Sequence, residues 1–287
     1  MPILLVVLFG CTGIAEAAFY KQYNRHHSEG GFIFTAMVSL FSMLFFVITD
    51  KGGFDFRPEI LPYAIISGIM YCIAALLTFV AFGCGSFALS VLILSYGGIF
   101  SIIYGIFFLK ESVTVFTVIG ILLSFVSIFL ARESRGKDEK GASAKWLICI
   151  LISFFCNGMF GVMQKMQQLK FNNEVSNEFM IISLAIASLI LFAIGVAKGK
   201  KDTFTVFRHG IGYAAAAGFS NGATNLIYII AATLVDISVL SPMAAGAKIV
   251  LSFFYSLLVY REKFSGRRII AVILGTVAVV ILNLKLN

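Results

Sequence analysis

The sequence predicts an all-α polytopic membrane protein with ten transmembrane helices arranged as two inverted five-helix repeats. Three observations support this fold class: an apolar composition, ten apolar segments of membrane-spanning length, and similarity between the two halves of the chain. Of the 287 residues, 60% are hydrophobic and only 13% are charged, and the mean hydropathy is +0.98. A soluble chain of this length cannot bury so much apolar surface, so lipid must solvate most of it.

The ten apolar segments are each about 20 residues long, enough for a helix to cross a hydrocarbon core of ~30 Å. The first segment lacks the basic residues that precede the apolar core of a signal peptide, so we interpret it as a helix. Proline is scarce and no helix is expected to break at mid-membrane, so Gly97-Gly98, Gly218 and Gly222 are expected to allow close helix contact. The predicted spans cover residues 3–20, 32–49, 60–81, 87–108, 113–131, 145–166, 178–197, 210–233, 238–260 and 267–284.

The two halves repeat each other. Residues 88–111 and 239–262 align with a constant shift of 151 positions, and residues 9–13 resemble residues 154–158. Such internal similarity in a hydrophobic chain is typical of transporters built from two related halves. The shift pairs Ser90 with Ser241, Gly97 with Lys248, Ser101 with Ser252, Tyr104 with Tyr255 and Glu111 with Glu262.

One hydrophilic linker divides the chain near its middle. The predicted organisation is a first five-helix repeat over residues 1–132, a polar linker over 133–144 and a second five-helix repeat over 145–287. An odd number of spans in each half forces the two copies into opposite orientations across the bilayer.

The formal net charge of +8 reports topology and not nucleic-acid binding. Fifteen of the 22 Lys and Arg residues fall in the odd-numbered loops or beside them, and six fall in the even loops and the C-terminal tail. The positive-inside rule therefore places the odd loops in the cytoplasm and both termini outside. The expected location is the plasma (cell) membrane, with the lipid bilayer as a partner.

Five plus five spans, a short polar linker and a glutamate that closes the fourth span of each half resemble the drug/metabolite transporter superfamily, EamA-like branch. Ser90 to Glu111 and Ser241 to Glu262, each with the span that follows, carry the resemblance. It implies ten helices in two inverted repeats and secondary transport of a small metabolite. It also implies cytoplasmic termini, opposite to the loop charges. We expect Glu111 and Glu262 to be interfacial ion-pairing groups beside Lys110 and Arg261.

Lys248 is the first candidate for a substrate-binding residue. A charge at bilayer depth costs about 2.5–3.5 kcal/mol on insertion scales and is a functional-site hypothesis by default. Lys248, Ser252 and Tyr255 share one face of a helix, and Gly97, Ser101 and Tyr104 form the matching face in the other half. Lys248 would bind a carboxylate or phosphate; the alternative is a permanent structural pair with an internal carboxylate.

Glu16 is the acidic residue deepest in an apolar span, four positions after Thr12 on the same helix face. It would exchange a proton with the substrate or bind an amine. The alternatives are a structural partner for Lys248 or a group that snorkels to the interface.

Amide side chains complete the predicted cavity wall. Asn157 and Gln164 lie in one predicted span, and Asn221, Asn225 and Tyr228 share a face of another. Buried amides in lipid also hydrogen-bond between helices, so helix packing is the alternative role. Lys165 is expected to be interfacial.

The predicted function is secondary transport, by alternating access, of a small polar metabolite such as an amino acid, another zwitterion or an organic anion. The alternatives are a cation or drug exporter that uses Glu16, a channel, or an intramembrane enzyme. We expect no enzyme activity, catalytic residue, cofactor or metal site, because the histidines show no metal spacing and no GxSxG or Walker A motif is present. Proton coupling through Glu16 is a hypothesis, and the sequence leaves oligomeric state, coupling ion and transport direction open.

Overall fold

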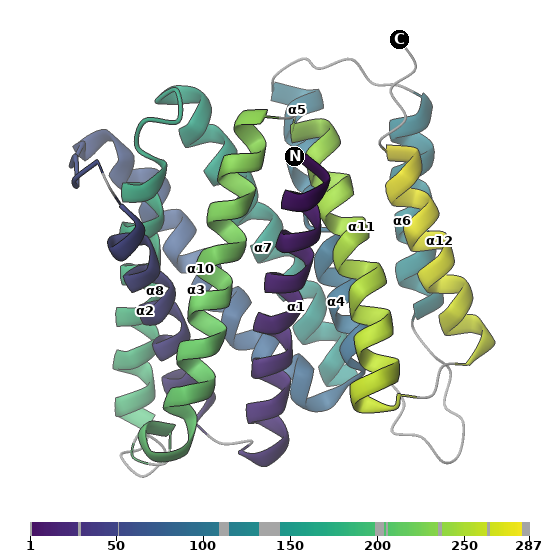
Figure 1. Ribbon diagram of the computed structural model, residues 1–287, viewed down its shortest axis with the longest axis horizontal. Coiled ribbons are helices and arrows are strands. Elements are labelled where there is room, and N and C mark those ends of the chain that lie inside the picture. Colours follow the sequence, from purple (N-terminus) through teal and green to yellow (C-terminus); the bar gives the residue numbers. More distant parts are fainter. Residues whose placement is uncertain are drawn as a thin grey trace.

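Every regular element in the described part of the chain is helical (Figure 1). The computed structural model describes residues 2–27, 30–50, 52–108, 115–131, 144–198, 204, 206–234, 237–262 and 265–282. The first half contains α1 (Pro2–His26), α2 (Gly31–Thr49), η1 (Pro58–Ile60), α3 (Leu61–Cys84), α4 (Phe87–Ser95), α5 (Gly98–Phe108) and α6 (Val115–Ala131). The second half contains α7 (Ala144–Lys170), α8 (Ser176–Lys198), η2 (Val206–Gly210), α10 (Ile211–Leu234), α11 (Ile237–Tyr255), η3 (Ser256–Tyr260) and α12 (Gly266–Leu282).

These helices confirm the predicted fold class. Each predicted span coincides with a helix or a consecutive helix pair, and most boundaries agree within a few residues. In the described chain, α1, α2, α3 with η1, α7 and α8 each have the length and hydropathy of a membrane span, and shorter apolar helices accompany them. The polar linker, predicted to cover 133–144, lies outside the described residues except for Ala144, and Glu111 also lies outside them.

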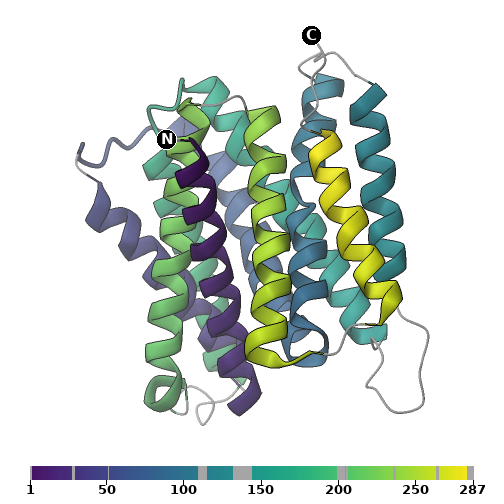
Figure 2. The ribbon, with the colours of Figure 1, turned by 45° about the vertical axis from the view of Figure 1, so that its right-hand side comes forward.

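The helix contacts repeat when the two halves are exchanged. α1 packs along α10, and the equivalent α7 packs along α3. α2 packs along α8, and α6 packs along α12, so equivalent helices also meet each other. Figures 1 and 2 both show α6 and α12 side by side at one edge of the bundle.

Equivalent helices run in opposite directions. Near the C-terminal end of α1, Lys21 Nζ donates a hydrogen bond to the carbonyl oxygen of Gly85 at 3.4 Å. Near the N-terminal end of α7, Trp146 Nε1 donates a hydrogen bond to Ser90 Oγ at 2.9 Å. Gly85 and Ser90 flank the start of α4, so these two helix ends lie at the same end of the bundle.

The fourth span is broken, contrary to the expectation of unbroken helices. α4 ends at Ser95 and α5 begins at Gly98. Across this break the amide N–H groups of Tyr96 and Gly97 donate to the carbonyls of Ile93 and Leu94, three residues back and not four. Broken helices at membrane depth are tolerated where protein or a cavity surrounds the backbone. A glycine pair is compatible with either a break or a close helix contact, so the sequence did not decide between them.

Glu262 connects the two halves at one end of the bundle through an ion pair and hydrogen bonds. Its carboxylate accepts hydrogen bonds from Lys21 Nζ at 2.7 Å, Ser86 Oγ at 2.6 Å, the Phe87 amide at 2.8 Å and Ser256 Oγ at 2.6 Å. Its ion-pair partner is therefore Lys21 of α1, and not the neighbouring Arg261 that the sequence suggested. Burial alone would raise the pKa of Glu262, but Lys21 and the two serine hydroxyls hold that pKa below its usual value.

Replacing Glu262 tests this cluster. We expect Glu262→Gln to lower stability at pH 7 by about 3–5 kcal/mol, because Lys21 loses the counter-charge of a buried pair. A folded-state pKa below the usual value of 4.5 means that the carboxylate stabilises fully above that value and loses its contribution as the pH falls through the folded pKa. The loss of thermal stability in detergent between pH 7 and pH 4 should therefore be smaller in Glu262→Gln than in wild type. Glu59→Gln, at an exposed position, is the control; equal melting temperatures for both variants would contradict the structural role.

Candidate transport site

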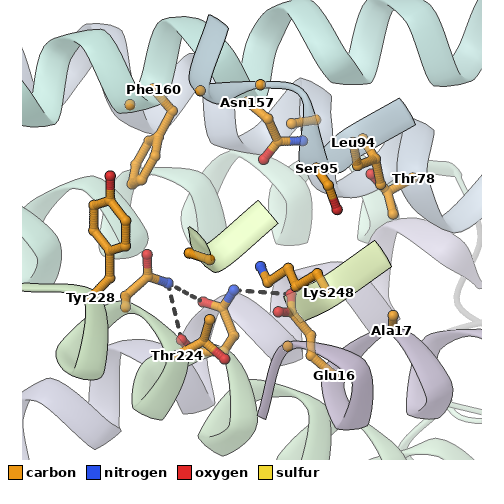
Figure 3. A pocket seen from close by; sticks show the side chains of 18 of the residues that line it. Glu16, Ala17, Thr78, Leu94, Ser95, Asn157, Phe160, Thr224, Tyr228 and Lys248 are labelled. Atoms are coloured by element: carbon orange, nitrogen blue, oxygen red, sulfur yellow. Dashed lines mark hydrogen bonds between the residues drawn. The ribbon is translucent and has the colours of Figure 1, made fainter. Parts of the chain in front are cut away.

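A cavity of about 290 Å³ lies between the two halves of the bundle (Figure 3). Residues of α1, α3, α4, α5, α7, α10 and α11 line it, together with Gly97 at the break between α4 and α5. Its polar lining comprises Glu16, Tyr20, Tyr71, Thr78, Ser95, Asn157, Gln164, Lys165, Gln168, Asn221, Thr224, Asn225, Tyr228 and Lys248.

Lys248 reaches the cavity from α11 and lies against α1. Its ammonium nitrogen is 4.4 Å from the centroid of the Phe9 ring, in a cation–π contact. The side-chain stem passes Gly13, where a Cβ atom would overlap Cε of Lys248 and lie 3.0 Å from Nζ. Figure 3 shows the Lys248 amino group directed into the space between the walls.

Glu16 lines the cavity from α1 and is held by Asn221 of α10. Asn221 Nδ2 donates a hydrogen bond to Glu16 Oε1 at 2.9 Å. On its other side, Asn221 Oδ1 accepts hydrogen bonds from Ser42 Oγ at 2.7 Å and from Tyr71 Oη at 3.2 Å. Donors on one side and a carboxylate on the other fix the orientation of the amide. Asn221 therefore connects Glu16 to α2 and α3 through a hydrogen-bonded network.

The two charges that line the cavity are not in direct contact. The ion pairs of the described residues join Lys21 to Glu262 and Arg57 to Asp55 and Glu174, and neither Glu16 nor Lys248 takes part in one. Both nevertheless line the same cavity. A gap between opposite charges in a cavity is a place for water or a polar ligand.

α7 supplies the facing wall. Asn157 Nδ2 donates hydrogen bonds to the backbone carbonyl oxygen of Ser153 at 3.0 Å and to Ser153 Oγ at 3.3 Å. The Asn157 side-chain oxygen Oδ1 takes part in neither of these two bonds. Gln164 and Gln168 line the cavity further along the helix, both at 7% exposure. Lys165, which was expected to be interfacial, also lines the cavity. The depth of a residue near a helix end depends on tertiary packing, which spacing alone does not give.

α10 completes the wall beside α1. Asn225 Nδ2 donates to the backbone carbonyl of Asn221 at 3.0 Å, and Thr224 Oγ1 is hydrogen-bonded to Thr12 Oγ1 at 2.8 Å. The Tyr228 ring lies 5.7 Å from the Phe9 ring. Figure 3 shows Thr224, Tyr228 and Glu16 on one side of the cavity and Asn157 and Phe160 on the other.

Of the three residues predicted to share the cavity-facing side of α11, only Lys248 lines the cavity. Ser252 is buried at 1% exposure and donates to the carbonyl oxygen of Ile249, and Tyr255 packs against Phe87. Both are absent from the cavity lining because α11 continues from Lys248 into the aromatic cluster at the end of the bundle that holds Glu262. Helical spacing identifies a shared face but not how far along the helix a cavity extends.

In the fourth span, the residues predicted to match this face do not all line the cavity either. Tyr104 stacks on Phe108 and does not line the cavity. The break at Gly97 resets the helical phase, so positions four and seven residues after Gly97 no longer share its direction. The side chain of Ser101 lies outside the described residues.

Sequence reasoning missed several lining residues. Gly13, Thr78 and Ser95 line the cavity, and the apolar side chains of Phe9 and Phe160 do so too. Gly13 had one available signal, because it belongs to the repeated segment 9–13. Thr78 and Ser95 are small hydroxyl residues that in spans usually bond their own backbone, so they give no distinguishing pattern. No cluster of three or more His, Cys, Asp or Glu side chains suited to a metal ion occurs within the described ranges.

Comparisons with known proteins agree with this architecture. Residues 144–284 match the family model described as the EamA-like transporter family. A crystal structure of a protein with 15% sequence identity superposes with a TM-score of 0.58 over 96% of this chain and 98% of that chain, which shows a shared fold. No curated protein matches the sequence at a significant level.

The helical architecture and the matched segment define the chain as an integral, multi-pass membrane transporter. More particularly, the second half of the chain matches the EamA-like transporter family over residues 144–284, which confirms the resemblance to the drug/metabolite transporter superfamily that the repeated helices indicated.

The Asn221 network leads to a stability prediction. Asn221→Leu removes the partner of three polar side chains at once: Glu16, Ser42 and Tyr71. Each buried group left without a partner costs roughly 1–3 kcal/mol, so the variant should melt well below wild type in detergent. Ser42→Ala removes one hydrogen bond only and should have a smaller effect. Equal melting temperatures for Asn221→Leu and Ser42→Ala would show that Asn221 does not organise the network.

Proposed function

We propose that this protein is a secondary carrier of a small zwitterionic metabolite, such as an amino acid, in the plasma membrane. The ligand carboxylate lies at Lys248 and the ligand ammonium lies at Glu16. Transport proceeds by alternating access, with the two repeats moving about the cavity between them.

The observation that carries this proposal is the pair of opposite charges that share a cavity without direct contact. Glu16 belongs to the first half and Lys248 to the second, and both line the 290 Å³ cavity. A permanent structural pair would be expected to close into a short ion pair, because low dielectric strengthens the attraction. A ligand that carries both charges would neutralise both residues, and water would serve in its absence.

The surroundings of each charge favour this assignment. Lys248 has an aromatic ring on one side, and this contact leaves its N–H donors available for an anion. Glu16 Oε1 accepts a hydrogen bond from Asn221, and its carboxylate has further acceptor capacity for an ammonium group. The cavity volume is at the lower end of the range for ligand pockets, which favours a small metabolite.

A barrier at one end of the cavity favours a carrier over a channel. Phe82 lines the main cavity and also a second cavity of about 200 Å³ that Lys21, Tyr260 and Glu262 line. Phe82 packs against Phe87 at 5.6 Å between ring centroids, within the aromatic cluster at that end of the bundle. The Phe82 ring therefore borders both cavities, at a place where an alternating-access carrier would close the path in one of its states.

A cation or drug exporter is the second candidate. The aromatic rings of Phe9, Tyr20, Tyr71, Phe82, Phe160 and Tyr228 line the cavity and favour cationic ligands through cation–π contacts. Lys248 opposes this function, because its ammonium already lies over Phe9 and repels a second cation.

Exchange in proteoliposomes tests the proposed function. Vesicles loaded with a mixed metabolite extract are compared for wild type, Lys248→Met and Glu16→Gln. Wild type should exchange zwitterions, and each variant should lose at least about 10-fold in exchange, the equivalent of one charge-assisted hydrogen bond. Exchange of organic cations that depends on Glu16 but not on Lys248 would establish the second candidate. Zwitterion exchange that is equal in all three proteins would remove both residues from the site.

Proton coupling through Glu16 is a separate prediction. Glu16 is a carboxylate of the described cavity lining, and a proton bound there would compete with the ligand ammonium, so coupling through Glu16 would exchange a proton for the substrate. A pH gradient with the acidic side inside the vesicles should therefore accelerate zwitterion uptake by wild type and have no effect on Glu16→Gln at its residual rate. Uptake by wild type that does not respond to the gradient would exclude this role.

A further inference from the structure

We infer that Gly13 is a positioning residue for Lys248, and that the absence of a side chain at this position sets the recognition of the ligand carboxylate. The inference rests on the proposed zwitterion carrier. Gly13 bears no functional group, yet it determines where the ammonium group of Lys248 lies.

The Lys248 side chain packs directly against Gly13. A Cβ atom on Gly13 would overlap Cε of Lys248 and lie 3.0 Å from Nζ and 3.4 Å from Cδ. The lysine stem therefore occupies the volume that any other residue at position 13 would fill. Gly13 is buried in a regular part of α1, so no turn or backbone strain accounts for the glycine.

Glu16 and Lys248 are arranged along one face of α1. Phe9, Gly13 and Glu16 follow the i, i+4, i+7 spacing, so they share the helix face that borders the cavity. Lys248 crosses this face at Gly13, with its ammonium over Phe9. About one helical turn along α1 separates Gly13 from Glu16. The glycine thus places the ammonium within reach of a ligand bound at Glu16 but out of ion-pair contact with it.

The repeat-related helix crossing elsewhere in the bundle has glycine at both equivalent positions. The repeat pairs Gly13 with Gly158 and Lys248 with Gly97. In the structure a Cβ atom on Gly97 would lie 3.6 Å from the backbone nitrogen of Gly158. The same helix crossing therefore occurs twice, and in each case a side chain fills the volume left by the glycine: the ring of Phe100 at Gly158 and the stem of Lys248 at Gly13. Only the crossing at Gly13 places a charge there.

The experiment compares wild type, Gly13→Ala, Gly10→Ala and Lys248→Met in proteoliposomes. The probes are a mixture of the neutral L-amino acids and the amines that correspond to their decarboxylation. Gly13→Ala should lower the ratio of amino-acid to amine exchange at least about 10-fold, because Lys248 no longer reaches the carboxylate.

Gly10→Ala is the matched control. Gly10 faces α11 from the same helix, where an added Cβ would lie 2.7 Å from Cδ1 of Leu251 and 3.2 Å from Cβ of Ala247. It inserts the same methyl group into the same helix crossing without contacting Lys248, and neither it nor Leu251 lines the cavity. Gly10→Ala should leave the ratio unchanged. An equal change of the ratio in both alanine variants, or no change in Gly13→Ala, would overturn the inference.

A double-mutant cycle measures the contact without transport. Melting temperatures in detergent are compared for wild type, Gly13→Ala, Lys248→Ala and the double variant. Alanine is favoured over glycine inside a helix by about 1 kcal/mol, so Gly13→Ala should raise the melting temperature in the Lys248→Ala background, and raise it less or lower it in wild type, where the Lys248 side chain must move. An equal effect in both backgrounds would show that Gly13 does not position Lys248.

The two proposals fail in different ways. Wild type that exchanges no amino acid overturns the carrier proposal and the inference with it. Lys248→Met that exchanges amino acids as wild type does removes Lys248 from the site of the carrier and overturns the inference. Amino-acid exchange that depends on Lys248 but is unaffected by Gly13→Ala leaves the carrier proposal standing and overturns the inference alone.

Discussion

Glu16 and Lys248 carry opposite charges inside a helix bundle that lipid surrounds, and the bundle must supply a polar environment for each of them. A charge at bilayer depth costs about 2.5–3.5 kcal/mol on insertion scales, so each needs compensating contacts. Asn221 donates to Glu16, and the face of the Phe9 ring receives Lys248. Because the two charges do not close into an ion pair, the cavity between them keeps a polar gap that matches a ligand with both charges.

The two halves of the inverted repeat contribute opposite charges to the site, Glu16 from the first half and Lys248 from the second. Two related halves would give a symmetric cavity if their sequences had remained alike. At the repeated helix crossing, Gly97 of the first half meets Gly158 of the second, whereas Lys248 of the second half meets Gly13 of the first. At the end of the bundle, the Glu262 cluster joins α1 and the start of α4 to the second half. Architecture is thus shared between the halves, whereas the charged group that would recognise an anion belongs to one of them.

The spans could be predicted from the sequence because bilayer thickness fixes both the length and the polarity of a membrane helix. Glu16 and Lys248 could be found for a related reason: a charge within an apolar segment is rare and conspicuous. The break at Gly97 could not be predicted, since a glycine pair serves equally well at a close helix contact. Ser252 was predicted to lie at the site because it shares a helix face with Lys248, but the position of the cavity along that face depends on tertiary packing.

The partners of each polar residue were the least predictable feature. Asn221 was selected for its amide, yet its bonds to Glu16 and Ser42 join segments 205 and 179 residues away in sequence. Glu262 was expected to pair near its own loop, and it pairs with Lys21 at a separation of 241 residues. Such pairings depend on which helices the fold brings together, and helix spacing within one span does not contain that information.

Equilibrium binding to purified wild-type protein tests whether one ligand contacts both Glu16 and Lys248. Each neutral amino acid is titrated alongside the amine that lacks its carboxylate and the acid that lacks its ammonium. A ligand held by both Glu16 and Lys248 should bind at least about 10-fold more tightly as the zwitterion than as either analogue, because each analogue leaves one charge without a partner. An amine or an acid that binds as tightly as its zwitterion would show that only one of the two charges contacts the ligand, and would contradict the account.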